Sequence, residues 1–212
     1  MIDTINRFAR RIPTLAVYFL LVLPAPYLFY LALTGGLGPD PVKALEHEYG
    51  EIALQLLIAG LCVTPLRRLA DLNLIRFRRT LGVLAFTYVT LHLSVWALLD
   101  VQTLDRVVQD IVKRPYITIG MAGFALLLPL ALTSNNLSVR RLGQNWRKLH
   151  RLTYLAVLLG GLHYIWLAKG IQLEPLLYMA AIVALLALRL PLSGNRRASR
   201  AANADSGMAK TG

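Results

Sequence analysis

Six long apolar runs, separated by short polar segments, dominate the hydrophobic pattern of the chain. They cover residues 14–33, 47–66, 81–99, 116–133, 152–168 and 175–192. Each run is close to the roughly 17 to 25 residues that a helix needs to cross the apolar core of a bilayer. The runs are continuously apolar and lack the alternation of strands in a membrane barrel. The pattern therefore predicts an all-α, polytopic membrane bundle with six transmembrane helices.

Composition supports the membrane class. The chain has 212 residues, 56% of them hydrophobic, and a mean hydropathy of +0.54, which is too apolar for an ordinary soluble domain. We expect an N-terminal segment at 1–13, a six-helix transmembrane domain at 14–192 and a disordered tail at 193–212, which is too polar to pack. The first run resembles a signal peptide, but it is long enough to be retained as an anchor. Pro24 and Pro26 are expected to kink it.

The net charge of +12 lies mainly in the loops. Three segments and the C-terminal region carry most of the cations: Arg7, Arg10 and Arg11; Arg67, Arg68, Arg76, Arg78 and Arg79; Arg140, Arg141, Arg147, Lys148 and Arg151; and Arg189, Arg196, Arg197 and Arg200. The loops between them are poorer in cations or mix them with acids. The positive-inside rule therefore places both termini in the cytoplasm. A nucleic-acid-binding protein would gather such cations on one folded face, so we exclude nucleic acid as a partner.

His92 and His163 lie inside the third and fifth runs, at nearly the same distance from the arginine-rich loops. His92 is thirteen positions after Arg79, and His163 is twelve positions after Arg151. A helical rise of 1.5 Å per residue puts both imidazoles roughly 18 to 20 Å from those boundaries. Ionisable side chains at membrane depth are costly and mark functional sites. Two imidazoles at one level on different helices are what bis-histidine ligation of a haem b needs.

Small residues near the two histidines favour the same interpretation. Ala85 lies seven residues before His92, and Ala156 and Gly160 lie seven and three residues before His163. Small side chains on these faces would leave room for a macrocycle between the helices. The lone Cys62 excludes both an internal disulfide and the CxxCH attachment of a c-type haem. Any haem is therefore non-covalent.

His150 is predicted at the arginine-rich end of the fifth helix, roughly 20 Å below His163. Arg78 occupies the matching level on the third helix, where a second ligand pair would have its other histidine. On a straight helix His150 and His163 would point roughly 140° apart, so a shared face needs a distortion, which we place at Gly160 and Gly161. One haem is predicted at the outer level. A second haem, bound through His150, stays open.

Two polar features mark the outer boundary. His47 lies beside Glu46 and Glu48, and its charged neighbours predict a solvated residue rather than a ligand. In residues 100–113 apolar side chains recur at helical spacing, which predicts a short interfacial helix. Its apolar residues are Leu104, Val107, Val108, Ile111 and Val112. We interpret this helix as a surface connector, with a docking face for an outer partner as the alternative.

Seven short motifs follow one another between residues 38 and 170: LEHEYG at 45–50, VTPLRRL at 63–69, LNLIRFRRTLG at 72–82, KRPYITIG at 113–120, LALTS at 130–134, WRKLHRLTYLA at 146–156 and HYIWLAKG at 163–170. In this order they resemble the MsrQ (formerly YedZ) family. That family belongs to the ferric-reductase-like transmembrane group, whose helical core also occurs in NADPH oxidases. The resemblance covers most of the predicted bundle but little of the first run or the tail.

The resemblance implies a haem b subunit in the bacterial inner membrane that passes electrons to MsrP, a periplasmic molybdopterin enzyme that reduces methionine sulfoxide in oxidised proteins. The chain would be a redox subunit of that oxidoreductase and would not itself reduce the sulfoxide. The family is associated with electron input from the quinone pool or a cytoplasmic flavin reductase, and with FMN as a further cofactor. Residue by residue, His92, His150 and His163 match the family's haem histidines. Arg78 matches its arginine at the inner position.

Other functions remain open at this stage. A stand-alone transmembrane ferric or quinone reductase would be active without a periplasmic partner. A proton-coupled transporter would use His92 and His163 as relay groups, since histidine titrates near neutral pH. The runs offer little acidic partner chemistry beyond Glu51, and no repeated halves of the kind transporters show. A non-redox anchor or assembly factor would leave the intramembrane histidines unexplained.

Overall fold

The computed structural model describes residues 2–168 and 172–189, which are all-helical and contain no strand. The elements are α1 (Ile2–Arg11), α2 (Thr14–Val22), α3 (Pro24–Thr34), α4 (Pro41–Leu69), the 3-10 turn η1 (Ile75–Phe77), α5 (Arg78–Ser94), the π-helix η2 (Val95–Val101), α6 (Leu104–Lys113), α7 (Pro115–Leu132), α8 (Asn136–Leu142), α9 (Gln144–Leu149), α10 (Leu152–Leu167) and α11 (Leu173–Ala187). The predicted all-α class is therefore confirmed.

Four of these segments are long and apolar enough to cross a membrane. They are Thr14–Thr34, which comprises α2 and α3, then Pro41–Leu69, Ile75–Val101 and Pro115–Leu132. Helix α10 has 16 residues and α11 has 15, which is shorter than the roughly 20 residues of a typical span. The sixth predicted run extended to residue 192, whereas α11 ends at Ala187. Residues 190–192 and the predicted tail at 193–212 lie outside the described residues, and the six-span topology stays a prediction.

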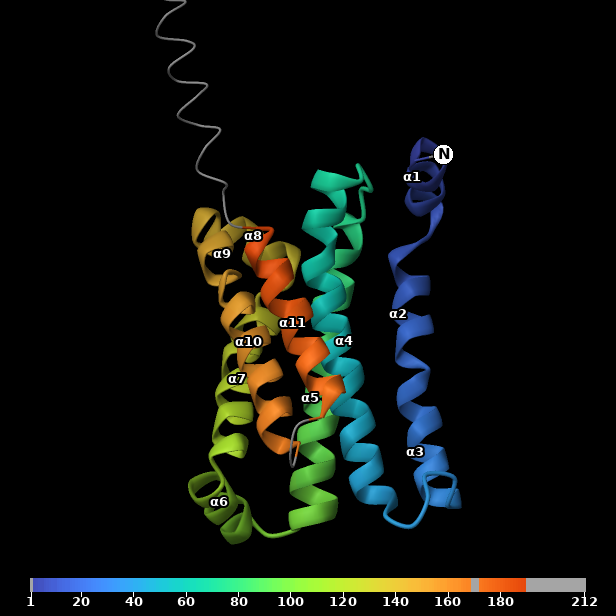
Figure 1. Ribbon diagram of the computed structural model, residues 1–212. Coiled ribbons are helices and arrows are strands. Elements are labelled where there is room, and N and C mark those ends of the chain that lie inside the picture. The colour runs from blue at the N-terminus through green and yellow to red at the C-terminus, as the bar shows by residue number, and fades with distance from the viewer. Residues whose placement is uncertain (1, 169–171, 190–212) are drawn as a thin grey trace, which may run out of the picture.

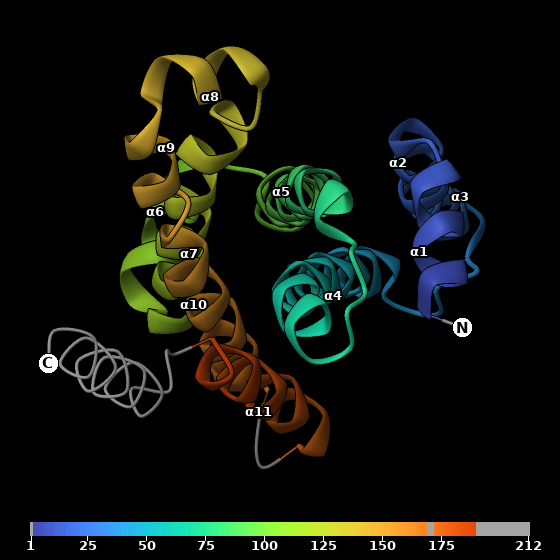
Figure 2. The ribbon, with the colours of Figure 1, turned by 90° about the horizontal axis from the view of Figure 1, so that it is seen from above.

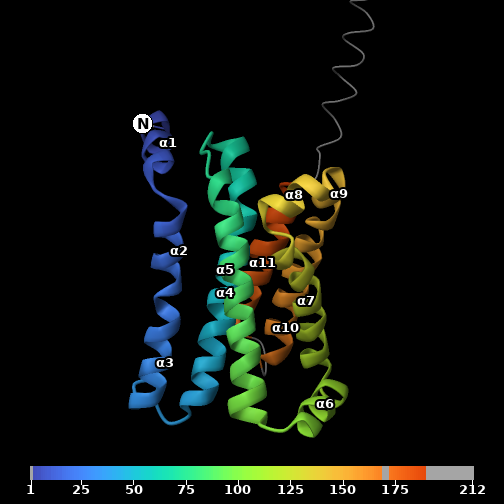
Figure 3. The ribbon, with the colours of Figure 1, turned by 180° about the vertical axis from the view of Figure 1, so that it is seen from behind.

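The long helices form a bundle in which neighbours in sequence pack side by side. Helix α4 pairs with α5, and α7 pairs with α10, while α11 packs on α10 and α4. Viewed from above, α7, α10 and α11 form an arc beside α4 and α5, and the rod of α1 to α3 stands on the other side (Figure 2). Helix α6 lies across one end of the bundle (Figures 1 and 3). We refer to this end as the α6 end.

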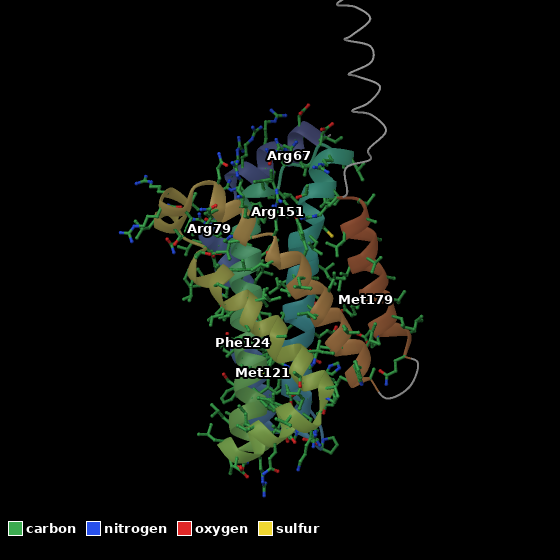
Figure 4. The ribbon with its side chains drawn as sticks, turned by 90° about the vertical axis from the view of Figure 1, so that its left-hand side faces the viewer. Arg67, Arg79, Met121, Phe124, Arg151 and Met179 are labelled. Carbon is green, nitrogen blue, oxygen red and sulfur yellow. The ribbon has the colours of Figure 1, made fainter. Side chains whose placement is uncertain are left out.

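The opposite end carries most of the arginines. Arg67 on α4, Arg79 on α5 and Arg151 before α10 lie toward it, whereas Met121 and Phe124 on α7 lie nearer the α6 end (Figure 4). We refer to it as the arginine-rich end. The arrangement agrees with the uneven distribution of charge among the loops.

The first predicted run is interrupted where its prolines were expected to kink it. Helix α2 ends at Val22, and α3 begins at Pro24 after Leu23. Two buried tyrosines of the bundle hold this rod through its backbone. The Tyr49 hydroxyl donates to the Ala25 carbonyl at 2.7 Å, and the Tyr88 hydroxyl donates to the Leu21 carbonyl at 2.9 Å. The rod is thus attached by polar contacts as well as by packing.

The predicted interfacial helix is present but begins later than residue 100. Residues Val95–Val101 continue from α5 as a π-helix, so that α6 starts only at Leu104. Val107 and Ile111 pack against a cluster that includes Trp96, while Leu104 and Val108 on another face are exposed. Helices α1, α8 and α9 were not predicted, because their residues lie in polar segments that flank the apolar runs.

Helix α4 contains Pro65, which has no N–H to donate to the carbonyl one turn earlier, that of Leu61. Arg189, which follows α11, donates to that carbonyl instead. Its other terminal nitrogen donates to the Tyr154 hydroxyl at 3.0 Å. Arg189 therefore joins the end of α11 to α4 and α10.

We predict that Arg189→Ala destabilises the bundle by about 1 kcal/mol, because a hydrogen bond between membrane helices contributes about 0.6 kcal/mol on average and two are lost. The substitution removes the donor to Leu61 and to Tyr154. Thermal unfolding of the detergent-solubilised protein measures the effect. Arg67→Ala, at an exposed position on α4, is the matched control. Equal stability of the two variants would show that the Arg189 contacts contribute nothing measurable.

Candidate functional site

A cavity of about 380 Å³ lies between α4, α5, α7 and α10. Apolar side chains form most of its wall, among them Leu54, Leu57, Phe124 and Leu127. Small residues from three helices also line it, namely Gly50, Ala53, Gly120, Gly123, Ala156 and Gly160. Charged side chains, namely Lys43, Glu46, Glu51, Asp100 and Arg114, contribute to the lining as well. The wall of the cavity is therefore mostly apolar, and its charged side chains come from α4 and from the segments that flank α6.

His92 from α5 and His163 from α10 face each other within this cavity. Their ring centres are 6.2 Å apart, and their planes are inclined by 80°. Imidazole nitrogens bind metal ions at about 2 Å, so two imidazoles that share one metal have ring centres about 6 Å apart. The prediction that these two histidines lie at one level is thus met by the geometry.

Both imidazoles are held by the same kind of hydrogen bond. His92 Nδ1 lies 2.8 Å from the Glu46 carbonyl oxygen, and His163 Nδ1 lies 2.7 Å from the Tyr116 carbonyl oxygen. A carbonyl only accepts hydrogen bonds, so each Nδ1 carries the proton and donates. The proton-free Nε2 then keeps its lone pair for a metal, which is the usual arrangement of ligating histidines. The residues present therefore fit a haem held between the two rings.

His150 lies outside this cavity lining, in the turn between α9 and α10. Its ring stacks on Trp146 with centroids 3.8 Å apart, and its Nδ1 lies 3.1 Å from the Trp146 carbonyl oxygen. Its Nε2 lies 3.5 Å from the Ser134 hydroxyl. Burial, together with the nearby Arg78 charge, lowers the pKa of His150. The structure thus brings two of the three predicted histidines together and leaves the third apart.

Two local expectations about these helices were wrong. A distortion at Gly160 and Gly161 was expected for His150 and His163 to share one face. Helix α10 continues unbroken through both glycines, and the chain is broken instead between α9 and α10. Ala85 does not line the cavity but is fully buried in the helix core. The first error came from treating residues on both sides of that break as one straight helix, and the second came from not knowing which helices pack against α5. Arg78 is the first residue of α5 and is exposed, near enough for its charge to act on His150.

Two residues of the cavity lining, His47 and Glu51, were not predicted to be part of the site. His47 was expected to be a solvated boundary residue; its side chain is 48% exposed, but it also contributes to the cavity lining. Its ring meets the Tyr164 ring edge-on at 5.6 Å. Glu51 accepts hydrogen bonds from Gln55 at 2.8 Å and from the Tyr178 hydroxyl at 3.0 Å. The contacts with Tyr164 and Tyr178 join residues far apart in sequence, so no local pattern indicates them.

The fold and the site together define a polytopic helical membrane protein with paired histidines facing a cavity inside the bundle. Comparison with known proteins identifies its class. Residues 48–161 match the family model described as ferric reductase like transmembrane component. That region contains α5, α7 and most of α4 and α10, which are the helices that enclose the cavity.

Curated relatives narrow the class to one family. A protein from Agrobacterium fabrum is 50% identical over 176 residues, which is 82% of this chain and 82% of the relative. One from Brucella ovis is 48% identical over 169 residues, or 79% of this chain and 77% of the relative. Each is named protein-methionine-sulfoxide reductase heme-binding subunit MsrQ. The chain therefore belongs to the MsrQ family. No solved structure matches it significantly.

Proposed function

We propose that this chain is a haem b membrane subunit that passes electrons to a separate catalytic subunit, which reduces methionine sulfoxide. The pair His92 and His163 carries the proposal, because both rings turn a proton-free Nε2 toward one cavity at a spacing that suits a single iron. The printed name of the relatives, a heme-binding subunit of a sulfoxide reductase, supports the same role. In this proposal the chain does not itself act on the sulfoxide.

A bound haem b would accept and release one electron at a time. The chain's own residues would hold the cofactor and control its surroundings. His92 and His163 would bind the iron, and their Nδ1 bonds would fix the ring orientations. Leu54, Leu57 and Leu127 would exclude water from the centre of the bundle. An apolar wall of this kind is one means by which a protein sets the reduction potential of its haem.

The charge distribution supports a direction for the transfer. By the positive-inside rule the arginine-rich end and both termini face the cytoplasm, and the α6 end faces the periplasm of the bacterial inner membrane, with six spans in all. Asp100 and Arg114, which flank α6 in sequence, contribute to the cavity lining. The haem would then lie close to the periplasmic surface, where a partner could take the electron.

The remaining parts of the proposal rest on the family resemblance. The partner would be a periplasmic, molybdopterin-containing, MsrP-like enzyme that repairs oxidised proteins. The donor would be the quinone pool or a cytoplasmic flavin reductase, with FMN as a further cofactor. His150, which lies in the turn before α10, and Arg78, the first residue of α5, would serve a cofactor at the arginine-rich end.

We predict that His92→Ala and His163→Ala each abolish the low-spin b-type haem spectrum, because each removes one of the two residues proposed to hold the iron. His150→Ala is expected to keep at least part of that spectrum, since His150 lies outside the cavity. Reduced-minus-oxidised absorption spectra and pyridine haemochrome per polypeptide, measured on purified protein, test both statements. His47→Ala, which removes a histidine that is no proposed ligand, is the matched control.

Two outcomes would contradict this site. Equal and complete loss of haem in all three variants would contradict a distinct ligand pair formed by His92 and His163. Wild-type protein that contains no haem after expression with haem supplied would overturn the redox function itself. About one haem per chain would indicate this pair alone, and about two would add a site at His150.

The proposed orientation predicts opposite accessibility of two exposed positions. In a Cys62→Ser background, Val108→Cys on α6 should react with a membrane-impermeant maleimide in cells whose outer membrane alone is permeabilised. Arg141→Cys on α8 should react only after the inner membrane is opened as well. The reverse pattern, or labelling of both positions from one side, would refute the assigned topology.

A further inference from the structure

We propose that Gly50 and Gly120 are positioning residues for the two haem ligands. Each glycine keeps one helical carbonyl open to an imidazole, and through that contact it sets the tautomer of the ligand and the reduction potential of the haem. The inference rests on the proposed function. It gives a physical role to two motifs of the sequence, LEHEYG and KRPYITIG, which the ligands themselves do not explain.

The two carbonyls and the two glycines share one spacing. The Glu46 carbonyl, which accepts from His92, lies four residues before Gly50, and the Tyr116 carbonyl, which accepts from His163, lies four residues before Gly120. In an α-helix the N–H of residue i+4 donates to the carbonyl of residue i. Each carbonyl oxygen therefore accepts twice, once from the glycine N–H and once from an imidazole, which its two lone pairs allow.

Helix geometry explains why the position four residues later must be a glycine. The Cα–Cβ bond of a helical residue tilts toward the helix N-terminus, so its side chain covers the preceding turn. A Cβ at Gly50 would lie 3.0 Å from His92 Nδ1, and a Cβ at Gly120 would lie 2.9 Å from His163 Nδ1. At 2.9 Å the His163 ring must move, and at 3.0 Å the His92 ring must give way by a few tenths of an ångström. Any larger residue would displace the imidazole from the carbonyl.

Other helical glycines of the described chain do not have this environment. A Cβ at Gly60 or Gly82 would meet nothing within 4 Å. At Gly160 it would touch Leu54, and at Gly161 it would strike Met179 and Ile182 of α11. Among the glycines of the described residues, only Gly50 and Gly120 face a histidine ring. The contact is therefore specific to the two proposed ligands rather than a general feature of helix packing here.

The same arrangement of carbonyl, glycine and histidine occurs once in each of two helix pairs. In the pair α4 and α5, the first helix supplies the carbonyl and the glycine and the second supplies His92. In the pair α7 and α10, the roles are the same for His163. The carbonyl and the histidine are 46 residues apart in the first pair and 47 in the second. The two pairs lie beside each other in the bundle (Figure 2), and residues of both pairs line the cavity.

The hydrogen bond affects the chemistry of the ligand as well as its position. Donation of Nδ1–H to a carbonyl raises the basicity of the ligating nitrogen. A more basic ligand favours the ferric over the ferrous iron and so lowers the reduction potential. Displacement of the ring by an added methyl group should weaken the bond and raise the potential. Loss of such supporting contacts typically weakens metal binding by about tenfold to a hundredfold.

The test compares alanine variants of four glycines in the purified, haem-loaded protein. Gly50→Ala and Gly120→Ala are each expected to raise the midpoint potential in a redox titration and to weaken haem retention about tenfold to a hundredfold. Gly60→Ala on α4 and Gly82→Ala on α5 are the matched controls, because a methyl group there meets open space. Both controls should keep the wild-type potential, spectrum and haem content.

The outcomes separate this inference from the proposed function. Alanine variants at Gly50 and Gly120 with wild-type potential and haem retention would overturn the inference, while a haem-containing wild type would leave the proposed function standing. If an alanine variant does not accumulate, electron–nuclear double resonance of the ferric wild type decides. An exchangeable Nδ1 proton on both axial imidazoles supports the inference, and its absence overturns it. A wild type without haem would refute the proposed function itself.

Discussion

The hydrogen bond from a buried imidazole to a helical carbonyl is the interaction on which the site depends. A histidine in the apolar interior of a membrane bundle must have its polar atoms satisfied, because unpaired polar groups there are costly. The carbonyls of Glu46 and Tyr116 satisfy one nitrogen of each ring and leave the other turned toward the cavity. The pairing of α4 with α5 and of α7 with α10 brings each carbonyl to its histidine. Packing and ligation are therefore parts of one arrangement.

Bonds from side chains to backbone carbonyls also join the rest of the bundle. Tyr49 and Tyr88 donate to backbone carbonyls of α3 and α2. Trp146 donates to the Thr133 carbonyl. Arg189 donates to the Leu61 carbonyl, which Pro65 leaves free. Lipid tails are as apolar as leucine, so the hydrophobic effect does little to bring membrane helices together. Polar contacts and close packing of small residues take that role. The carbonyl is a suitable acceptor, since it is present on every turn and adds no charge.

The sequence was sufficient for features that depend on one helix at a time. Apolar runs predicted the long helices, and counting residues from Arg79 and Arg151 placed His92 and His163 at one level, which agrees with their ring separation of 6.2 Å. Features that depend on two helices could not be predicted in this way. The burial of Ala85 away from the cavity and the role of Gly50 are both consequences of which helix faces which. Local patterns carry no information on that pairing.

The choice of a carbonyl as the partner of each proposed ligand has a consequence for a protein that connects two sides of a membrane. Ligating histidines elsewhere often donate to a carboxylate, which can gain a proton and thereby change the basicity of the ligand. A backbone carbonyl does not titrate in the physiological range, and both acceptors here belong to helices of the bundle. The partners of His92 and His163 therefore do not change their own charge with the pH on either side. Any pH dependence of the proposed haem's potential would then come from ionisable side chains of the cavity lining, such as Glu46, and not from the groups that hold the two ligands.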